Sequence, residues 1–577
     1  MIAVAPWAAD LSATSYDKVH ARPSRSPGST TVMGGGLRLT GVRRVHATVA
    51  VIALAGLAIR LAVAWRPLAS IDRLFIPDDS YYTLSIARSL AHGHGPTVGH
   101  APLTSGFQPL LAFLEAPIFW FIHSPDGGLR AALVLLALCD ALTAVWLARI
   151  AYRIGWTSAA VIAAGVWALS PFAVANAMGG LETALSTMLA IALVDAWMTV
   201  HRRPSTTGWV LCGMVAGLAV LARIDSLLLL ALLVGAECLG RRSWCHLRHL
   251  VPTAAGTALM LGPWWIYSLL TFGSPVPASG NAVRRLVQLH QLGVRSELAW
   301  AAGTVLGAPF TLLTSFRHTL FAHPTVGAAL FLGIAAVGAA TALLVACGWS
   351  AGNDRRFAAC LPLFAVGLLG FYSLYLGAIW FDTRYLAPVA AATTLLLAIV
   401  GTALWRRDAR VARTAVCLLV GGLVVAVALP SDVHYLVATP AGTVDTGYDG
   451  AKGYRELAPG VLAAAPSGSV IGSLQSGALG YYNDGRVKVV NLDGVVNSGA
   501  ARALQNRRLG EYARSQGVQY LADWPYNLGV FITVSSDSRL TPHSFHAVYA
   551  AAPQGADIFT LWRIDWTRSG ALPQPPG

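Results

Sequence analysis

Charge is scarce in this sequence. Only 12% of its 577 residues are Asp, Glu, Lys or Arg, whereas hydrophobic residues make up 55%. A soluble domain carries roughly 25% charged residues, and a chain this long with so few charges could not cover a globule with polar surface. The scarcity excludes a soluble globular protein and predicts a protein that lies in lipid.

Cysteine is scarce at the positions where it could form disulfides or bind a metal. Most of the seven Cys lie in or beside apolar runs, none shows metal-ligand spacing, and the polar C-terminal part has none. We therefore expect neither disulfides nor a zinc site. The net charge is +14, but most arginines lie in short loops between apolar runs, as topology-setting residues do, so no nucleic-acid partner is expected.

Long apolar runs account for most of the chain. A helix needs about 20 apolar residues to cross a bilayer, and about eleven runs approach that length. They lie at 45–64, 129–148, 157–175, 181–200, 208–222, 226–240, 250–271, 324–347, 357–377, 386–405 and 413–430. Two further stretches, 106–123 and 298–316, are placed along the outer surface, because a span at 106–123 would move the next arginine pair outside. The sequence predicts an α-helical polytopic membrane protein.

The loops between these runs set a direction through the membrane. Residues 1–44 are polar and basic, and we expect them to form a disordered cytoplasmic segment. The arginine-rich loops within 45–430 then fall on the same side, which places the first outer loop, 67–128, and residues 431–577 outside. One outer segment, 273–323, is an exception because it is also rich in arginine.

Residues 431–577 have a different pattern. Gly, Pro, Asp and Asn separate short strand-like runs, at Val470–Leu474, Val487–Leu492, Val518–Leu521 and Ile558–Trp562. This alternation predicts a small extracytoplasmic α/β domain. A ligand contact would be sought in its polar segments 475–477 and 491–494, although turn chemistry also explains them.

The first outer loop carries the most informative motif. In Pro77-Asp78-Asp79-Ser80-Tyr81-Tyr82, two carboxylates follow a proline where a helix would begin. Acidic residues stabilise a helix N-terminus by about 0.3–1 kcal/mol, so a capped surface helix explains the pair. Two adjacent carboxylates at a membrane surface also suit a base or a cation site. The pattern alone leaves both interpretations open.

Further charged residues fall on the same outer side. Glu182 lies at the mouth of a span, where a carboxylate is costly without a partner. Arg223 and Asp225 lie at a turn between two short spans, where a mutual ion pair would explain them. Arg384 lies at another mouth, where it could meet a phosphate or snorkel to the interface. Because these residues and the acidic pair are all predicted on the same side of the membrane, together they indicate a functional site.

These residues resemble the GT-C superfamily of membrane glycosyltransferases, which includes protein mannosyltransferases, the aminoarabinose transferases that modify lipid A, and mycobacterial arabinosyltransferases. The mark of that family is an acidic motif in the first outer loop, and Pro77–Tyr82 looks like it. Gly179-Gly180-Leu181-Glu182-Thr183 is similar to the acidic element of the second outer loop. Arg384-Tyr385-Leu386-Ala387-Pro388 is similar to a segment common in bacterial members. The resemblance covers most of 45–430.

The resemblance implies a transferase that moves a sugar, with inversion, from a polyprenyl-phosphate donor to a hydroxyl of a cell-envelope glycan, lipid or protein. The reaction would take place on the outer face of a bacterial cytoplasmic membrane. The family's first-loop acid implies that Asp78 or Asp79 is the base, with Asp79 slightly favoured. Supporting or acceptor-binding acids would be Glu182 and Asp225. The donor phosphate would meet Arg384, Arg284, Arg285 and Arg223.

Several points stay open in the sequence. A divalent cation, Mg²⁺ or Mn²⁺, could be held by Asp78, Asp79 and Glu182, but members of the superfamily differ in this need. A transporter or flippase of a lipid-linked sugar is the main alternative, although such proteins often show internal repeats and none is found here. A surface receptor would need far fewer helices. The sequence names neither the sugar nor the acceptor.

Overall fold

The computed structural model describes residues 34–99, 102–239, 248–290, 353–372, 382–385, 387–406, 453–536, 540–551 and 558–568. Among these residues, those up to His46 and those from Ala47 onward fall in two separate units. The predicted boundary at 430/431 lies outside the described residues, as do the stretches 298–316, 324–347 and 413–430. The predicted division into domains therefore stays a prediction.

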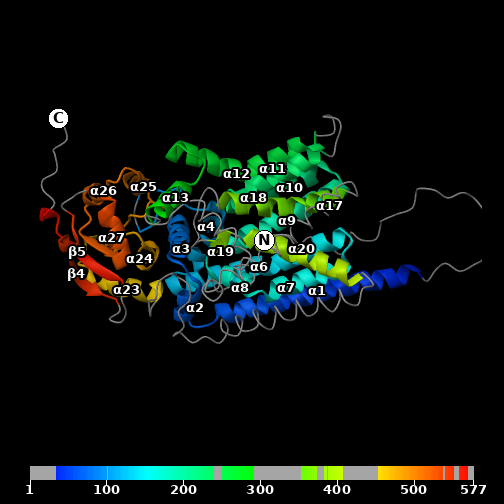
Figure 1. Ribbon diagram of the computed structural model, residues 1–577, viewed down its shortest axis with the longest axis horizontal. Helices are drawn as coiled ribbons and strands as arrows, with labels where there is room; N and C mark the ends of the chain where they lie inside the picture. The colour runs from blue at the N-terminus through cyan, green and yellow to red at the C-terminus, as the bar shows by residue number, and fades with distance from the viewer. Residues whose placement is uncertain are drawn as a thin grey trace, which may run out of the picture. The chain divides into compact units, whose positions relative to one another are not determined.

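Helices make up most of the described chain (Figure 1). Those before the C-terminal part are α1 (Gly34–Ala64), α2 (Leu68–Phe75), α3 (Asp78–Ala91), α4 (Pro109–Glu115), α5 (Ile118–Phe121), α6 (Pro125–Arg153), α7 (Thr157–Leu169), α8 (Pro171–Met178), α9 (Thr183–Arg202), α10 (Thr206–Ala222), α11 (Ser226–Leu239), α12 (Leu250–Phe272), α13 (Ser279–His290), α17 (Asn353–Ala358), α18 (Cys360–Phe371), α19 (Asp382–Tyr385) and α20 (Ala387–Arg406).

Within the described ranges, three helices are long and apolar enough to cross a membrane, namely α1, α6 and α9. Helices α7 and α8 would make a fourth span if the pair, bent by 53°, is counted as one. The bend falls at Ser170-Pro171, where proline begins a new helix because it has no N–H to continue the old one. These helices are those of a multi-pass membrane protein, while the predicted total of about eleven spans stays a prediction.

The arginines of the loops predicted to be cytoplasmic meet at one end of the helices. Arg149 and Arg153, at the end of α6, form ion pairs of 3.0 and 2.9 Å with Asp195 of α9. Arg202, at the end of α9, pairs with Asp354 of α17. Helix α9 begins after Glu182, so this acid lies at the opposite end, roughly 30 Å away for a helix of this length. The structure thus keeps the two predicted sets of loops apart.

A buried ion pair holds the break between α7 and α8. The Arg60 guanidinium of α1 donates from Nε to Asp140 of α6 at 2.6 Å. It also donates to the carbonyl oxygens of Ala168 and Trp167 at 2.8 and 3.2 Å. Because the chain turns away at Ser170, the Ala168 carbonyl has no partner further along the helix, whereas the Trp167 carbonyl also accepts from the N–H of Ser170 at 3.2 Å. Arg60, which is fully buried, supplies the missing donor.

The C-terminal part is a five-stranded mixed sheet with helices on both faces. Its helices are α23 (Tyr454–Ala464), α24 (Gly477–Tyr482), α25 (Ser498–Gln505), α26 (Leu509–Ser515) and α27 (Pro525–Thr533). Its strands are β1 (Val470–Ser473), β2 (Lys488–Asn491), β3 (Tyr520–Asp523), β4 (Phe545–Ala550) and β5 (Thr560–Ile564). The strand order is β2-β1-β3-β5-β4, and β5 is antiparallel to both β3 and β4. The predicted α/β character is confirmed, but β4 was not predicted.

The two faces of the sheet enter different hydrophobic clusters. Ile471, Val489 and Ala522 belong to a cluster that continues into the helices of the first outer loop and α6. Their strand neighbours Val490 and Leu521 face the other way, into a cluster built mainly with α25, α26 and α27. Alternation along each strand produces this division. One face of the sheet therefore shares its core with the membrane part of the chain.

The Arg60–Asp140 pair can be tested by variants. We expect Arg60→Met alone to lower the free energy of unfolding by about 3–5 kcal/mol, because it leaves a buried carboxylate without its cation. The double variant with Asp140→Leu removes both charges and should recover most of that loss. Thermal unfolding in nanodiscs measures both. Equal melting temperatures for Arg60→Met and the wild type would contradict a structural role.

Candidate functional site

The acidic motif of the first outer loop begins a helix, as its proline suggested. Pro77 has extended backbone angles and α3 starts at Asp78. The hydroxyl of Ser80 donates to the carbonyl oxygen of Gly179 at 2.5 Å. Two segments far apart in the sequence, the first-loop motif and the 179–183 motif, are thereby held together.

Asp78 is buried against the C-terminal sheet. Its Oδ2 accepts from the backbone N–H of Gly477 at 2.7 Å and its Oδ1 from that of Ala478 at 2.9 Å. A Cβ on Gly477 would lie 2.1 Å from the Asp78 carbonyl oxygen, so only glycine allows this approach. Asp78 is 2% exposed. It therefore joins α3 to the start of α24 and has no open face.

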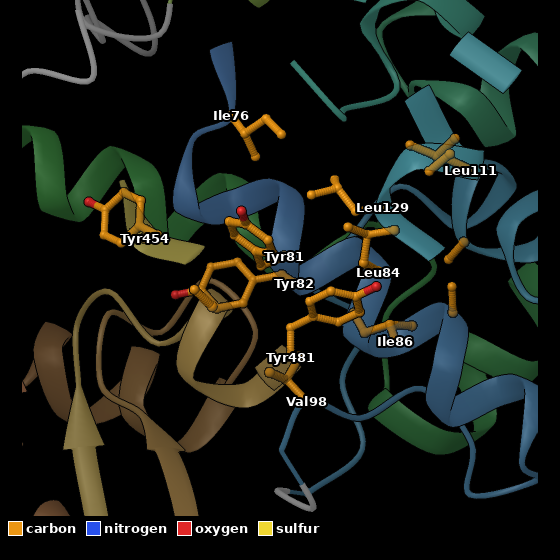
Figure 2. Close-up of a cluster of buried hydrophobic side chains, with 14 of the residues drawn as sticks. Ile76, Tyr81, Tyr82, Leu84, Ile86, Val98, Leu111, Leu129, Tyr454 and Tyr481 are labelled. Carbon is orange, nitrogen blue, oxygen red and sulfur yellow. The ribbon is translucent and has the colours of Figure 1, made fainter. Parts of the chain in front are cut away.

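Tyr82 makes a second connection one turn along α3. Its hydroxyl donates to Oδ2 of Asp493 at 3.0 Å and accepts from the amide of Asn491 at 2.9 Å. Figure 2 shows Tyr81 and Tyr82 of α3 beside Tyr481 of α24. The polar segments 475–477 and 491–494 thus contact the first outer loop, in addition to forming turns.

A third connection involves α2 and α23. Asp72 accepts from the Tyr81 hydroxyl at 2.5 Å and from the backbone N–H of Arg455 at 2.9 Å. The Arg455 guanidinium pairs with Asp126 at 2.5 Å, and Arg73 pairs with Glu456 at 2.5 Å. The first loop and the sheet are therefore joined by several buried or half-buried polar contacts rather than by one.

Asp79, although adjacent to Asp78, faces elsewhere. Its Oδ2 accepts from Nη1 of Arg384 at 2.7 Å, and 27% of its side chain is exposed. Consecutive residues on a helix point about 100° apart, which separates the two carboxylates. Of the two candidate bases, only Asp79 is both paired with a cation and open to solvent.

Arg223 is the centre of a second group. Its guanidinium donates to Glu182 at 2.6 Å, to Asp225 at 3.0 Å and to the Tyr372 hydroxyl at 2.5 Å. The Tyr372 hydroxyl in turn donates to Asp225 at 2.6 Å. All three guanidinium nitrogens are engaged, so the network fixes the two acids at the mouths of their helices.

Tyr385 links the two arginines. Its ring stacks on that of Tyr372 with centroids 4.6 Å apart. The guanidinium carbons of Arg223 and Arg384 lie 4.9 and 5.0 Å from its centroid, within the range of a cation–π interaction. Asp79, Glu182, Arg223, Asp225 and Arg384 are thus brought into one charged cluster, which we call the Arg223–Arg384 cluster.

Some predicted site residues are not seen at the cluster, and two residues of interest were not predicted from the sequence. Arg284 and Arg285 lie on α13, which packs against α25 of the C-terminal part; the structure does not describe a contact between them and the cluster. Tyr372 was not predicted, and only its placement at a helix end could have indicated it. Glu115 of α4 was also missed. It is fully buried, its carboxyl has no hydrogen-bond partner in the described chain, and burial raises its pKa well above the usual value.

The three acids considered as metal ligands are already engaged by N–H donors. Both carboxyl oxygens of Asp78 accept from backbone N–H groups. Asp79 accepts from Arg384 through Oδ2 and Glu182 accepts from Arg223 through Oε1, so each keeps a second oxygen for which the described chain shows no donor. Among the described residues, no group of three or more His, Cys, Asp or Glu is placed to hold a metal ion.

Solved structures similar to this chain include an archaeal oligosaccharyltransferase and the aminoarabinose transferase ArnT. AglB, the oligosaccharyltransferase of Archaeoglobus fulgidus, in complex with an inhibitory peptide and a dolichol-phosphate, aligns with a TM-score of 0.55 at 14% identity over 89% of this chain and 74% of that one. A structure of the same enzyme with Zn and sulfate has a TM-score of 0.54 at 15% identity over 89% and 72% of the two chains.

ArnT from Cupriavidus metallidurans bound to undecaprenyl phosphate aligns with a TM-score of 0.51 at 14% identity over 88% and 97% of the two chains. Both neighbours are members of the GT-C superfamily, so the GT-C-like fold expected from the sequence is confirmed. No protein-family model and no curated protein sequence matches the chain.

The contact between the first loop and the sheet should weaken as the pH rises. Burial raises the pKa of Asp78 to about 8, and those of Asp72 and Asp493 to about 7, from the usual 3.8. A carboxyl whose pKa is higher in the folded state contributes stability that is present at low pH and lost as the pH rises through the folded pKa. We expect the melting temperature to fall between about pH 5 and pH 9, and to fall less in Asp78→Asn. A melting temperature that rises over this range would contradict the assignment.

Proposed function

We propose that this protein is a glycosyltransferase that moves a sugar from a polyprenyl-phosphate donor to a hydroxyl of a cell-envelope acceptor. The reaction would take place at the outer face of a bacterial cytoplasmic membrane, with the N-terminus in the cytoplasm. The pairing of a partly exposed acid with a half-buried arginine, Asp79 with Arg384, supports this proposal most strongly. The fold shared with AglB and ArnT, whose solved complexes contain a polyprenyl phosphate, also supports it.

The chemistry requires a base and a cation close together. The Asp79 carboxylate takes the proton of the acceptor hydroxyl as that oxygen attacks the anomeric carbon. The bond between the anomeric carbon and the phosphate oxygen breaks, and polyprenyl phosphate leaves with the electron pair. Attack from the face opposite the leaving group inverts the anomeric centre. The charge that develops on the phosphate oxygen needs a nearby cation.

Arg384 is suited to that second role. Guanidinium groups bind phosphate through two parallel N–H donors, and Arg384 already faces the acid that would act as base. An arriving phosphate would draw the guanidinium away from Asp79. The carboxylate would then lose its strongest partner and become a better acceptor for the hydroxyl proton. Donor binding and activation of the base would thus be coupled through one side chain.

The Arg223 network would orient the cluster. Arg223 has three partners in the protein, so it is better placed to position Glu182 and Asp225 than to bind phosphate itself. These two acids would accept hydrogen bonds from acceptor hydroxyls beside the base. Asp78, closed off by the C-terminal part, would hold α3 in place.

The first prediction from this mechanism separates the adjacent acids. Purified protein in nanodiscs is given a panel of polyprenyl-phosphate sugars with membrane extract as acceptor, and release of polyprenyl phosphate is measured. We expect Asp79→Asn to lower the rate about 10²–10⁴-fold, the usual worth of a general base, with little change in melting temperature. Asp78→Asn should instead lower the melting temperature, because an amide cannot accept from both backbone donors.

Asp484→Asn, which changes an exposed acid of the C-terminal part, is the matched control and should resemble the wild type. If no donor turns over, or if folded Asp79→Asn is as active as the wild type, the transferase mechanism is wrong. A lipid-linked sugar transporter, which would not need this carboxylate, then becomes the better interpretation.

A second prediction concerns the leaving group. Arg384→Lys keeps the charge but replaces the planar fork with a point charge. We expect the KM for the donor to rise about ten-fold, since two parallel hydrogen bonds to phosphate become one, with a smaller change in kcat. The measurement is initial rate against donor concentration. An unchanged donor KM would exclude Arg384 from phosphate binding.

A further inference from the structure

The C-terminal sheet carries a cavity far from the Arg223–Arg384 cluster. It has a volume of about 390 Å³ and lies where Ser469 and Gln519 enter β1 and β3. The contacts to α3 are made at the other end of the parallel strands, by Gly477 after β1 and by Asn491 at the end of β2. The cavity and the first outer loop therefore lie at opposite ends of the parallel strands.

The lining combines aromatic rings with hydrogen-bonding groups. Tyr520 of β3 and Arg563 of β5 are cross-strand partners, so their side chains share one face. Gln519, Trp566 and the backbone of 466–469 complete the wall. Arg563 is the charged member of the lining, and no acidic residue belongs to it. The cavity therefore suits a neutral or acidic ligand and disfavours a cationic one.

Part of this lining is held in position without a ligand. The Trp566 indole N–H donates to the carbonyl oxygen of Val518 at 2.7 Å, and Oε1 of Gln519 accepts from the N–H of Val470 at 3.3 Å. By contrast, the Arg563 side chain is exposed, and neither it nor the Tyr520 hydroxyl has a hydrogen-bond partner in the described chain. A fixed indole ring beside open hydrogen-bond donors is an arrangement that suits an orientation-specific small-molecule site.

We propose that this cavity binds a sugar unit of an extended acceptor glycan, neutral or acidic. A sugar presents an apolar ring face, which packs on aromatic side chains, and a rim of hydroxyls, which pairs with guanidinium and amide groups. The parallel strands alone measure roughly 13 Å, so a short acceptor could not occupy both the cavity and the cluster. This inference rests on the proposed function. It adds that the acceptor of the proposed transferase is a polymeric glycan.

The test measures glycan binding directly and does not depend on turnover. Full-length protein in nanodiscs, without donor, is applied to immobilised disaccharides and octasaccharides prepared from cell-envelope glycan. We expect the octasaccharide to bind. Arg563→Ala, which removes the open donors, and Ser467→Trp, which fills the cavity from an exposed position, should each weaken that binding about ten-fold, or about 1.4 kcal/mol.

Two variants serve as matched controls. Arg502→Ala removes an exposed arginine of α25, with the same loss of charge, and should bind like the wild type. Asp484→Asn, which changes an exposed acid of the C-terminal part, should also keep octasaccharide binding. Wild-type binding by Arg563→Ala and Ser467→Trp, or no octasaccharide binding at all, would overturn the inference.

The failures of the two proposals are distinguishable. If no donor turns over but octasaccharide binding still depends on Arg563, the transferase mechanism is wrong and the cavity stands as a glycan site. If transfer depends on Asp79 but binding ignores Arg563, the mechanism stands and the cavity is not an acceptor site.

Discussion

A carboxylate removed from water must find its donors elsewhere, and Asp78 finds both of them in the backbone of α24. An unpaired buried group of this kind costs several kcal/mol, so α3 and the C-terminal sheet cannot separate cheaply once they have met. The same contact fixes the rotation of α3 about its axis. Asp79, about 100° further round the helix, is then directed at Arg384. The geometry of the cluster thus depends on a contact made outside it.

This dependence explains why the sequence could not choose between the two acids. Both follow Pro77, both begin the helix, and both suit its N-terminus equally well. The choice is made by Gly477, almost 400 residues away, whose missing side chain admits the Asp78 backbone. The structure gives Asp78 a structural role at the helix start, and it leaves Asp79 as the candidate for the proposed base.

The positions of charged and apolar residues in the sequence allowed most of the correct predictions about the fold. Arginine-rich loops predicted that Glu182 and Arg202 lie at opposite ends of α9. Short apolar runs bounded by turn residues located β1, β2, β3 and β5, because these strands are buried on both faces. Strand β4 escaped notice because its middle residues are largely exposed. The bend at Ser170-Pro171 was not predicted either. It lies within a continuous apolar run, and the helix carbonyl left open by the bend accepts from an arginine of another helix, which the sequence does not reveal.

The two arginines of the cluster differ in a way that only the structure shows. Arg223 has every guanidinium nitrogen engaged by a protein group, and releasing it would leave two acids without their cation, which is strongly destabilising at low exposure. Arg384 donates to Asp79 and to the Tyr385 hydroxyl, and the Asp79 side chain is 27% exposed. A phosphate can therefore approach the Arg384–Asp79 pair from solvent, whereas the Arg223 network is closed by protein groups on every guanidinium nitrogen.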